Sequence, residues 1–293
     1  MYQEVAFDPE CFSEYHYYGL LKSEFGFEKG RYIVAPIRSW AREAVKAVKD
    51  SQQIKPIRKQ TIKNFLNKMQ RNRDVQLVLL PKYRKGISTD NWEEWCQQQV
   101  ALSPFKSVIS ESLSESINYE DILEQNPNWV ISPTLQINKK ACEIITVIEP
   151  LLNFGGEVTI VDQYFSLANN PVLDAVLRVI QNNQSINTVR LVTSVNVKNP
   201  DQVFRNDYLN KYANLPKFEF IVAPGKFFHD RYVISGLGAI KSGHGFSEGV
   251  EQGAQADNLS ISLCGKEEAD ATLQWVNTVI EEGKATTTVL YGG

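Results

Sequence analysis

Short apolar runs alternate along this chain with segments in which apolar residues recur every three or four positions. The apolar runs predict β-strands, and they cover residues 32–35, 75–80, 158–161, 189–192, 218–222, 228–235 and 286–290. The periodic segments predict amphipathic helices, and they cover residues 40–48, 61–69, 90–100, 137–151, 171–180, 201–212 and 271–280. Asp90 and Asn170 are the expected N-caps of two of these helices, and Pro171 is expected at a first helical position.

This alternation predicts a mixed α/β fold with a largely parallel sheet layered between helices. Residues 102–133 interrupt the pattern, because they are rich in Ser, Asn and Glu, and we expect them to form a connector with one short helix. The chain is therefore divided into an N-terminal α/β region, residues 1–130, and a C-terminal domain, residues 131–293. The two regions share a strand–helix rhythm but no convincing residue-level repeat.

Composition excludes several classes of protein. The 293 residues are 43% hydrophobic and 22% charged, as in an ordinary globular chain rather than a disordered or fibrous one. No apolar run approaches the roughly 18 residues of a membrane helix, and the first residues do not resemble a secretory signal. The four cysteines are far apart, as expected of reduced structural thiols. We therefore expect a cytoplasmic protein without a metal site or cofactor.

Basic residues are concentrated between residues 51 and 85, where ten Lys and Arg accompany one acidic residue, Asp74. The rest of the chain is acidic, with 21 basic and 33 acidic residues. Such a block attracts phosphate-rich polymers or anionic lipid surfaces. The alternative is a solvated helix face that only keeps the protein soluble. The candidate nucleic-acid contacts are Lys55, Arg58, Lys59, Lys63, Lys68 and Arg71.

Two of the three histidines lie in residues 227–235, with the sequence FFHDRYVIS, and residues 243–248, with the sequence GHGFSE. If residues 228–235 form a strand, His229 and Arg231 project from the same face, because side chains alternate along a strand. A guanidinium holds phosphate oxygens in a fork, and an imidazole acts as nucleophile or proton donor. The glycines around His244 allow a backbone to approach an oxyanion closely. The alternative is a strand histidine packed in a core, followed by a glycine-rich hairpin.

These residues resemble the phospholipase D superfamily, whose signature opens with H-x-K and continues to a Gly-Ser pair. His229 and Arg231 stand in the H-x-K positions, and Gly243-His244 falls at the Gly-Ser pair, whereas Gly236 replaces the family's Asp and its Asn is missing. The resemblance is closer to the phospholipase D-like domain at the C-terminus of MIT-domain proteins and to its prokaryotic relatives, over residues 135–293. The motifs shared with that subgroup are His229-Asp230-Arg231, Gly243-His244-Gly245, Asp162-Gln163-Tyr164 and Leu191-Val192-Thr193-Ser194.

The resemblance implies a phosphodiester-recognising protein, and specifically a metal-independent nuclease or nuclease-like component of a bacterial defence or mobile-element system. It makes His229 the nucleophile and Arg231 the phosphate clamp. The proton donor is then His244, or His229 of a second copy in a homodimer. The supporting residues are Asp162, Tyr164, Thr193, Asp230, Gly243, Gly245 and Ser247. The alternative is a catalytically inactive module that binds anionic lipid or a protein partner, and a purely structural subunit is a third.

Aromatic residues offer two further features. Tyr15-His16-Tyr17-Tyr18 is either a stacking platform for bases or the packing surface of a hydrophobic N-terminal segment. Trp92 and Trp95 are three residues apart on an expected helix, which favours a core or a subunit interface.

Overall fold

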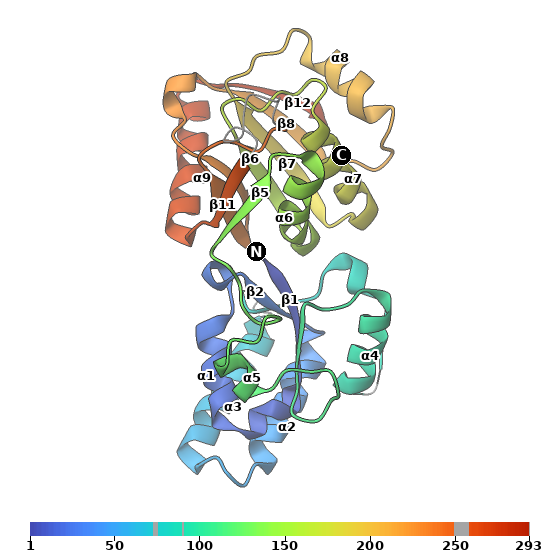
Figure 1. Cartoon of the computed structure of the whole chain (residues 1–293), viewed down its shortest axis with the longest axis vertical. Coiled ribbons are helices and arrows are strands. Elements are labelled where there is room, and N and C mark those ends of the chain that lie inside the picture. Colours follow the sequence, from blue (N-terminus) through green and yellow to red (C-terminus); the bar gives the residue numbers. More distant parts are fainter. Residues whose placement is uncertain (73–75, 90, 249–257, 293) are drawn as a thin grey trace. The chain divides into compact units, whose positions relative to one another are not determined.

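The computed structural model describes residues 1–72, 76–89, 91–248 and 258–292. They form two compact units, Tyr2–Ile131 and Ser132–Gly293, the second of which also includes Met1 (Figure 1). Both units combine helices with a β-sheet, so the expected mixed α/β class is confirmed.

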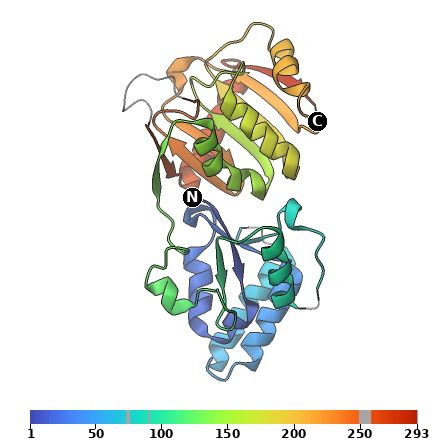
Figure 2. The same ribbon diagram turned by 45° about the vertical axis from the view of Figure 1, so that its right-hand side comes forward.

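The N-terminal unit contains a parallel sheet with the strand order β3-β2-β1-β4. Its strands are β1 (Gln3–Phe7), β2 (Arg31–Val34), β3 (Val78–Leu79) and β4 (Ser107–Ile109). Its helices are α1 (Tyr15–Glu24), α2 (Ile37–Asp50), α3 (Pro56–Asn72), α4 (Trp92–Leu102) and α5 (Tyr119–Leu123), with the 3-10 turns η1 (Pro9–Ser13), η2 (Phe27–Lys29) and η3 (Lys82–Arg84). Helices α2 and α3 pack side by side (Figure 2).

Two strands and one helix of this unit were not expected from the pattern. β1 and β4 are short, and β4 lies within the polar connector of residues 102–133, where α5 is the expected short helix. The unexpected helix is α1, which follows η1 directly. The N-cap of α4 is Asn91, whose side chain accepts a hydrogen bond from the Glu94 N–H, while Asp90 lies outside the described residues.

Aromatic rings form the centre of the N-terminal core around Phe7 of β1. The rings of Phe12, Tyr17, Phe25 and Trp40 lie 5.2–6.3 Å from the Phe7 ring. Tyr17 and Tyr18 are buried, as are Trp92 and Trp95 of α4. Core packing therefore explains these residues, whereas Tyr15 remains 41% exposed.

Arg84 is part of this interior rather than of a basic surface. Only 2% of its side chain is exposed, and its guanidinium lies 2.7 Å from a Glu4 carboxylate oxygen and donates a 2.9 Å hydrogen bond to the Ser103 carbonyl. Tyr83 also donates its hydroxyl to Glu4. Arg84 belongs to the basic block of the sequence, but the carboxylate of Glu4 in β1 neutralises its charge.

Removing this buried cation should destabilise the N-terminal unit. Arg84→Ala leaves Glu4 ionised and largely buried without its partner, so we expect a loss of about 3–5 kcal/mol in the free energy of unfolding. Urea unfolding followed by tryptophan fluorescence measures this loss, because four of the five tryptophans lie in this unit. Lys85→Ala, at an exposed neighbouring position, is the control and should change stability by less than about 0.5 kcal/mol. Equal stability of the two variants would contradict the prediction.

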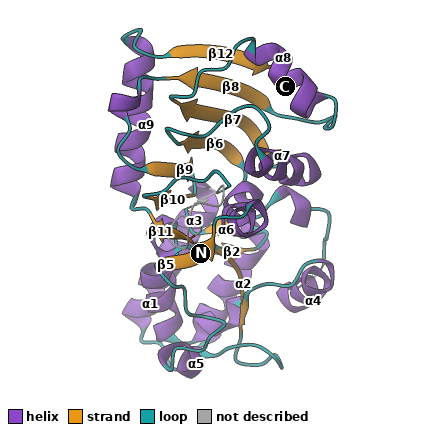
Figure 3. Ribbon diagram, turned by 45° about the horizontal axis from the view of Figure 1, so that its top comes forward, coloured by secondary structure: helices purple, strands orange, loops and turns teal. Residues whose placement is uncertain are grey.

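The C-terminal unit contains an eight-stranded sheet with the order β12-β8-β7-β6-β9-β10-β11-β5. Its strands are β5 (Thr134–Asn138), β6 (Gly156–Val161), β7 (Ile186–Thr193), β8 (Lys217–Val222), β9 (Arg231–Ser235), β10 (Gly238–Ser242), β11 (Asn258–Leu263) and β12 (Thr286–Tyr291). Its helices are α6 (Ala141–Phe154), α7 (Pro171–Asn183), α8 (Pro200–Phe204) and α9 (Lys266–Glu281), with the π-helical turn η4 (Arg205–Leu209) and the 3-10 turn η5 (Gly225–Phe227). Helix α9 lies on one side of the sheet, and α6 and α7 lie on the other (Figure 3).

This sheet is parallel only at its centre, where β7 pairs with β6 and β8. The remaining pairs are antiparallel. Residues 137 and 138, where the expected helix was to begin, belong instead to the edge strand β5, because residues 134–138 pair with β11, at least 120 residues further along the chain. As expected, Asn170 caps α7 by accepting hydrogen bonds from the N–H groups of Val172 and Leu173.

Candidate functional site

A buried carboxylate joins two of the motifs that carry the phospholipase D-like resemblance. Asp162 directly follows β6 and is 1% exposed. One of its oxygens accepts a 3.0 Å hydrogen bond from the Tyr164 N–H, and the other accepts a 2.6 Å bond from the Phe246 N–H. Gly245 has a φ of +80°, and a Cβ there would lie 2.6 Å from the same carboxylate. The loop of residues 243–247 therefore needs glycine at position 245 to reach Asp162.

Burial raises the pKa of Asp162, although the two backbone N–H groups and the charges of Arg231 and Lys139 act in the opposite direction. The Arg231 guanidinium donates hydrogen bonds to the carbonyls of Gly243, at 2.8 Å, and His229, at 3.4 Å. Its central carbon lies 5.5 Å from the centre of the Tyr164 ring. Both bonds come from Nη1 and connect Arg231 to the loop, whereas the buried Nε has no hydrogen-bond partner among the described residues.

Thr193 and Ser194 support the same region from the end of β7. The hydroxyl of Thr193 donates to the Gln163 carbonyl at 3.1 Å and accepts from the Val195 N–H at 3.1 Å. Ser194 donates to the same Gln163 carbonyl at 2.8 Å. Thr193 is fully buried, so its role is to join neighbouring strand ends rather than to contact a ligand.

His229 does not lie where the sequence pattern placed it. The strand β9 begins at Arg231, so His229 and Asp230 precede it and the alternation argument does not apply to them. Both line a pocket of about 320 Å³ beneath α9, and Arg231 is not among the lining residues. The prediction that His229 and Arg231 share one strand face is therefore wrong.

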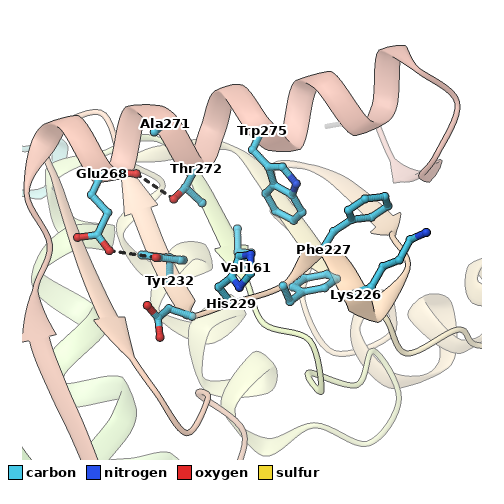
Figure 4. A pocket seen from close by; sticks show the side chains of 11 residues that line it. Val161, Lys226, Phe227, His229, Tyr232, Glu268, Ala271, Thr272 and Trp275 are labelled. Carbon is cyan, nitrogen blue, oxygen red and sulfur yellow. Dashed lines mark hydrogen bonds between the residues drawn. The ribbon is translucent and has the colours of Figure 1, made fainter.

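Aromatic and apolar side chains form most of this pocket's wall. Figure 4 shows His229 and Val161 below Trp275 of α9, with Phe227 beside them. The rings of Phe228 and Trp275 meet edge to face at 5.6 Å. No motif indicated Trp275, and the only available signal was the helical spacing that places it on one face of α9 with Glu268 and Thr272.

Charges of both signs lie beside His229, because Lys226, Asp230 and Glu268 all line the pocket. Glu268 accepts hydrogen bonds from the Tyr232 hydroxyl at 3.0 Å and from Lys241 at 2.9 Å. Burial acts to raise the pKa of Glu268, but these hydrogen bonds outweigh it and lower that pKa. The Lys241 ammonium offsets the charge of Glu268 in an ion pair. The lining therefore has neither a cluster of cations that would hold a phosphate nor an excess of unpaired carboxylates.

His244 is exposed on the loop of residues 243–247 and is not among the residues that line the His229 pocket. Its carbonyl accepts a hydrogen bond from Lys139 at 2.9 Å, and its N–H donates to Ser242. The Ser247 hydroxyl is buried and has no hydrogen-bond partner among the described residues. The structure thus brings together Asp162, Tyr164, Arg231, Gly243 and Gly245, and it places the His229 side chain in a different environment.

The cysteines provide no alternative nucleophile. All four are free thiols, and Cys11, Cys96 and Cys264 are buried. Burial raises the pKa of Cys96 and of Cys264 to about 12. These thiols remain protonated near neutral pH, as expected of structural cysteines.

The candidate basic contacts lie on and just before α3, which contains five Lys and Arg and no acidic residue. Lys55, Lys63, Lys68 and Arg71 form no ion pair with any described residue, in contrast to the lysines and arginines that carboxylates hold elsewhere in the fold. Two of the candidates have structural contacts. The Lys59 ammonium donates to the carbonyls of Lys49, at 2.8 Å, and Ser51, and the Arg58 guanidinium stacks 4.2 Å from the Tyr15 ring.

No protein-family model matches this chain, and no curated protein sequence matches it. Among solved structures, one similar chain is TrmBL2, described as an archaeal chromatin protein with a novel mode of DNA binding. The two chains share 11% identity with a TM-score of 0.31, over 56% of this chain and 59% of that one. A likeness this weak carries no argument about fold or function.

Two kinds of feature are absent from the part of the chain that the structure describes. None of the described helices has the length and apolar character needed to cross a bilayer. The described His, Cys, Asp and Glu side chains form no group of three or more that could hold a metal ion.

Replacing the buried carboxylate should loosen the C-terminal unit in a pH-dependent way. Asp162→Asn has one acceptor oxygen for two backbone N–H groups, so we expect a loss of about 1.5–3 kcal/mol in the free energy of unfolding. Because the folded chain has the raised pKa, it keeps the Asp162 proton to higher pH than the unfolded chain. The contribution of protonated Asp162 to the free energy of unfolding is complete below the pKa that Asp has in the unfolded chain. It is lost as pH rises through the raised pKa of Asp162 in the folded chain.

The stability gap between wild type and Asp162→Asn should therefore be largest in acid and shrink toward neutral pH. Urea unfolding followed by circular dichroism between about pH 4 and pH 8 measures this gap. Asp201→Asn, at an exposed position, is the matched control and should show neither the loss nor the trend. A gap that widens with rising pH would contradict the assignment.

Proposed function

We propose that this chain binds nucleic acid through the phosphodiester backbone, with α3 as the main contact. One observation carries the proposal: the positive charge of α3 is not neutralised by any described acidic side chain. The rest of the chain has more acidic than basic residues. Concentrating unpaired cations on one helix does not stabilise the folded state, because like charges repel. Such a surface attracts a polyanion and releases the counterions condensed on it.

The geometry around His229 favours a binding role over phosphohistidine chemistry. That mechanism needs a cationic clamp next to the nucleophile, but Arg231 does not line the His229 pocket, and its Nη1 bonds the carbonyls of Gly243 and His229. The phospholipase D-like resemblance is then best understood as a shared scaffold, with Asp162, Gly245 and Arg231 holding its loops. The cytoplasm, with its reduced thiols, is the compartment that we propose for this function.

Charge reversal on α3 tests the proposal. Lys63, Lys68 and Arg71 are the best positions, because no described residue forms an ion pair with them. We expect the triple change of these residues to Glu to weaken binding to all nucleic-acid sequences alike. The slope of the logarithm of the binding constant against the logarithm of the salt concentration should also become shallower, by about 0.7–0.9 for each phosphate that the variant no longer neutralises. Fluorescence anisotropy of labelled oligonucleotides over a salt series measures both effects.

The matched control carries the same change in net charge outside α3, as Lys106→Glu, Lys140→Glu and Lys198→Glu, all at exposed positions. We expect this control to keep most of the affinity of the wild type. Equal losses in the two variants would show a general charge effect and refute a specific role of α3. If wild type bound phosphatidylserine vesicles but no nucleic acid at low salt, the surface would be a lipid contact instead.

A nuclease is the second candidate function, because His229 is exposed at the mouth of its pocket. Our proposal predicts that wild type and His229→Ala bind oligonucleotides equally and that neither cleaves them, with or without a chelator. Incubation of labelled single and double strands, followed by denaturing electrophoresis, detects cleavage. Cleavage by wild type that His229→Ala abolishes would favour the phosphohistidine mechanism, with two copies of His229 meeting across a dimer.

A further inference from the structure

A groove of about 920 Å³ lies in the N-terminal unit beside the basic helix. It is lined by residues of α1, by α5 and by the segment of residues 125–131. Apart from Tyr15, on which Arg58 of α3 stacks, none of these residues is used by the candidate site or by the contacts of α3 considered so far. The groove therefore needs its own explanation.

Aromatic side chains line this groove in a way that suits planar ligands. The His16 ring lies 4.1 Å from the Tyr119 ring, and its buried Nε2 atom lies 3.6 Å from a Glu14 carboxylate oxygen. Trp129 also lines the groove, although it is only 5% exposed and the Arg31 guanidinium stacks 4.0 Å from its ring. Tyr15 is 41% exposed at the rim. Faces of this kind stack on nucleic-acid bases of any identity.

Gly19 keeps the groove open. It lies in the interior of α1, where its φ is ordinary, and a Cβ at this position would meet no atom within 4 Å. Glycine in the interior of a helix is destabilising relative to alanine, so the fold of this unit does not require it. A side chain at position 19 would project into open space and obstruct the approach of a ligand to the aromatic wall.

The groove is in direct contact with the positive surface of α3. Arg58, in the first turns of α3, stacks on Tyr15 at the groove rim, and Phe65 of α3 packs edge to face on Tyr18 at 5.5 Å. Lys22 adds a further cation 5.6 Å from the Tyr18 ring. The opposite wall is α5, where exposed Glu120 and Glu124 repel phosphates. A strand placed here has its phosphates toward α3 and its bases toward the groove.

From this juxtaposition we infer that the groove receives the unstacked bases of single-stranded nucleic acid whose phosphates contact α3. The inference rests on the proposed function and specifies the class of nucleic acid. The bases of a duplex are stacked and paired inside the helix and do not reach an aromatic groove of this kind. The chain therefore binds single strands more tightly than duplexes of the same length.

Filling the groove tests this inference without removing any native contact. We expect Gly19→Phe in the full chain to weaken binding of a labelled oligo-dT of about 12 nucleotides by roughly five- to hundredfold, the loss of one stacked base. Binding of a duplex of equal length should not change, because it depends on α3 alone. Gln98→Phe places the same ring on an exposed position of α4 and should bind both ligands as the wild type does.

The outcomes distinguish this inference from the proposed function. If Gly19→Phe binds oligo-dT as tightly as wild type, or if wild type prefers the duplex, the inference is refuted while α3 remains a nucleic-acid contact. If charge reversal on α3 has no effect on either ligand, the proposed function fails first. Should Gly19→Phe not fold, as judged by its thermal unfolding, Ser23→Phe obstructs the same groove from an exposed lining position and is expected to give the same selective loss.

Discussion

One carboxylate sealed from water joins distant segments of the C-terminal unit. Asp162 lies at the end of β6, and its two oxygens accept N–H groups from residues 164 and 246, which are far apart in the chain. An ionised group in an apolar interior is costly unless hydrogen bonds and opposite charge stabilise it. These hydrogen bonds hold the loop of residues 243–247 against the end of β6, and Arg231 supports the same loop by donating to the Gly243 carbonyl.

Positive charge serves two different purposes in the two units. Arg84 and Arg231 are structural, because carboxylates or carbonyls surround them and their contacts connect distant segments. The cations of α3 connect nothing in the described fold, apart from Lys59 and Arg58. This contrast supports electrostatic recognition on α3, which has five basic and no acidic residues, rather than at the HDR motif, where Asp230 precedes Arg231.

The two cavities differ in the charges that lie next to their aromatic walls. The His229 pocket is lined by Lys226, Asp230 and Glu268, whose charges largely offset one another together with the Lys241 ion pair. The groove beside α1 contains the ion pair of Glu24 and Arg31, but its rim meets the cations of α3 through Tyr15 and Arg58. Stacking surfaces contribute to nucleic-acid binding when a neighbouring positive surface holds the backbone, and α3 offers such a surface to the N-terminal groove.

The sequence by itself determined the features that depend on local pattern. Strand–helix alternation, the cap at Asn170 and the concentration of basic residues in α3 follow from residues close together in the chain. Tertiary structure decided what depends on distant partners. Pairing with β11 made residues 134–138 a strand, β9 began two residues after His229, and Glu4 drew Arg84 into the core. Periodicity shows which residues share a face, but only packing shows what that face meets. For this reason the sequence indicated the aromatic run of residues 15–18 but not the groove that Tyr15 and His16 line with α5.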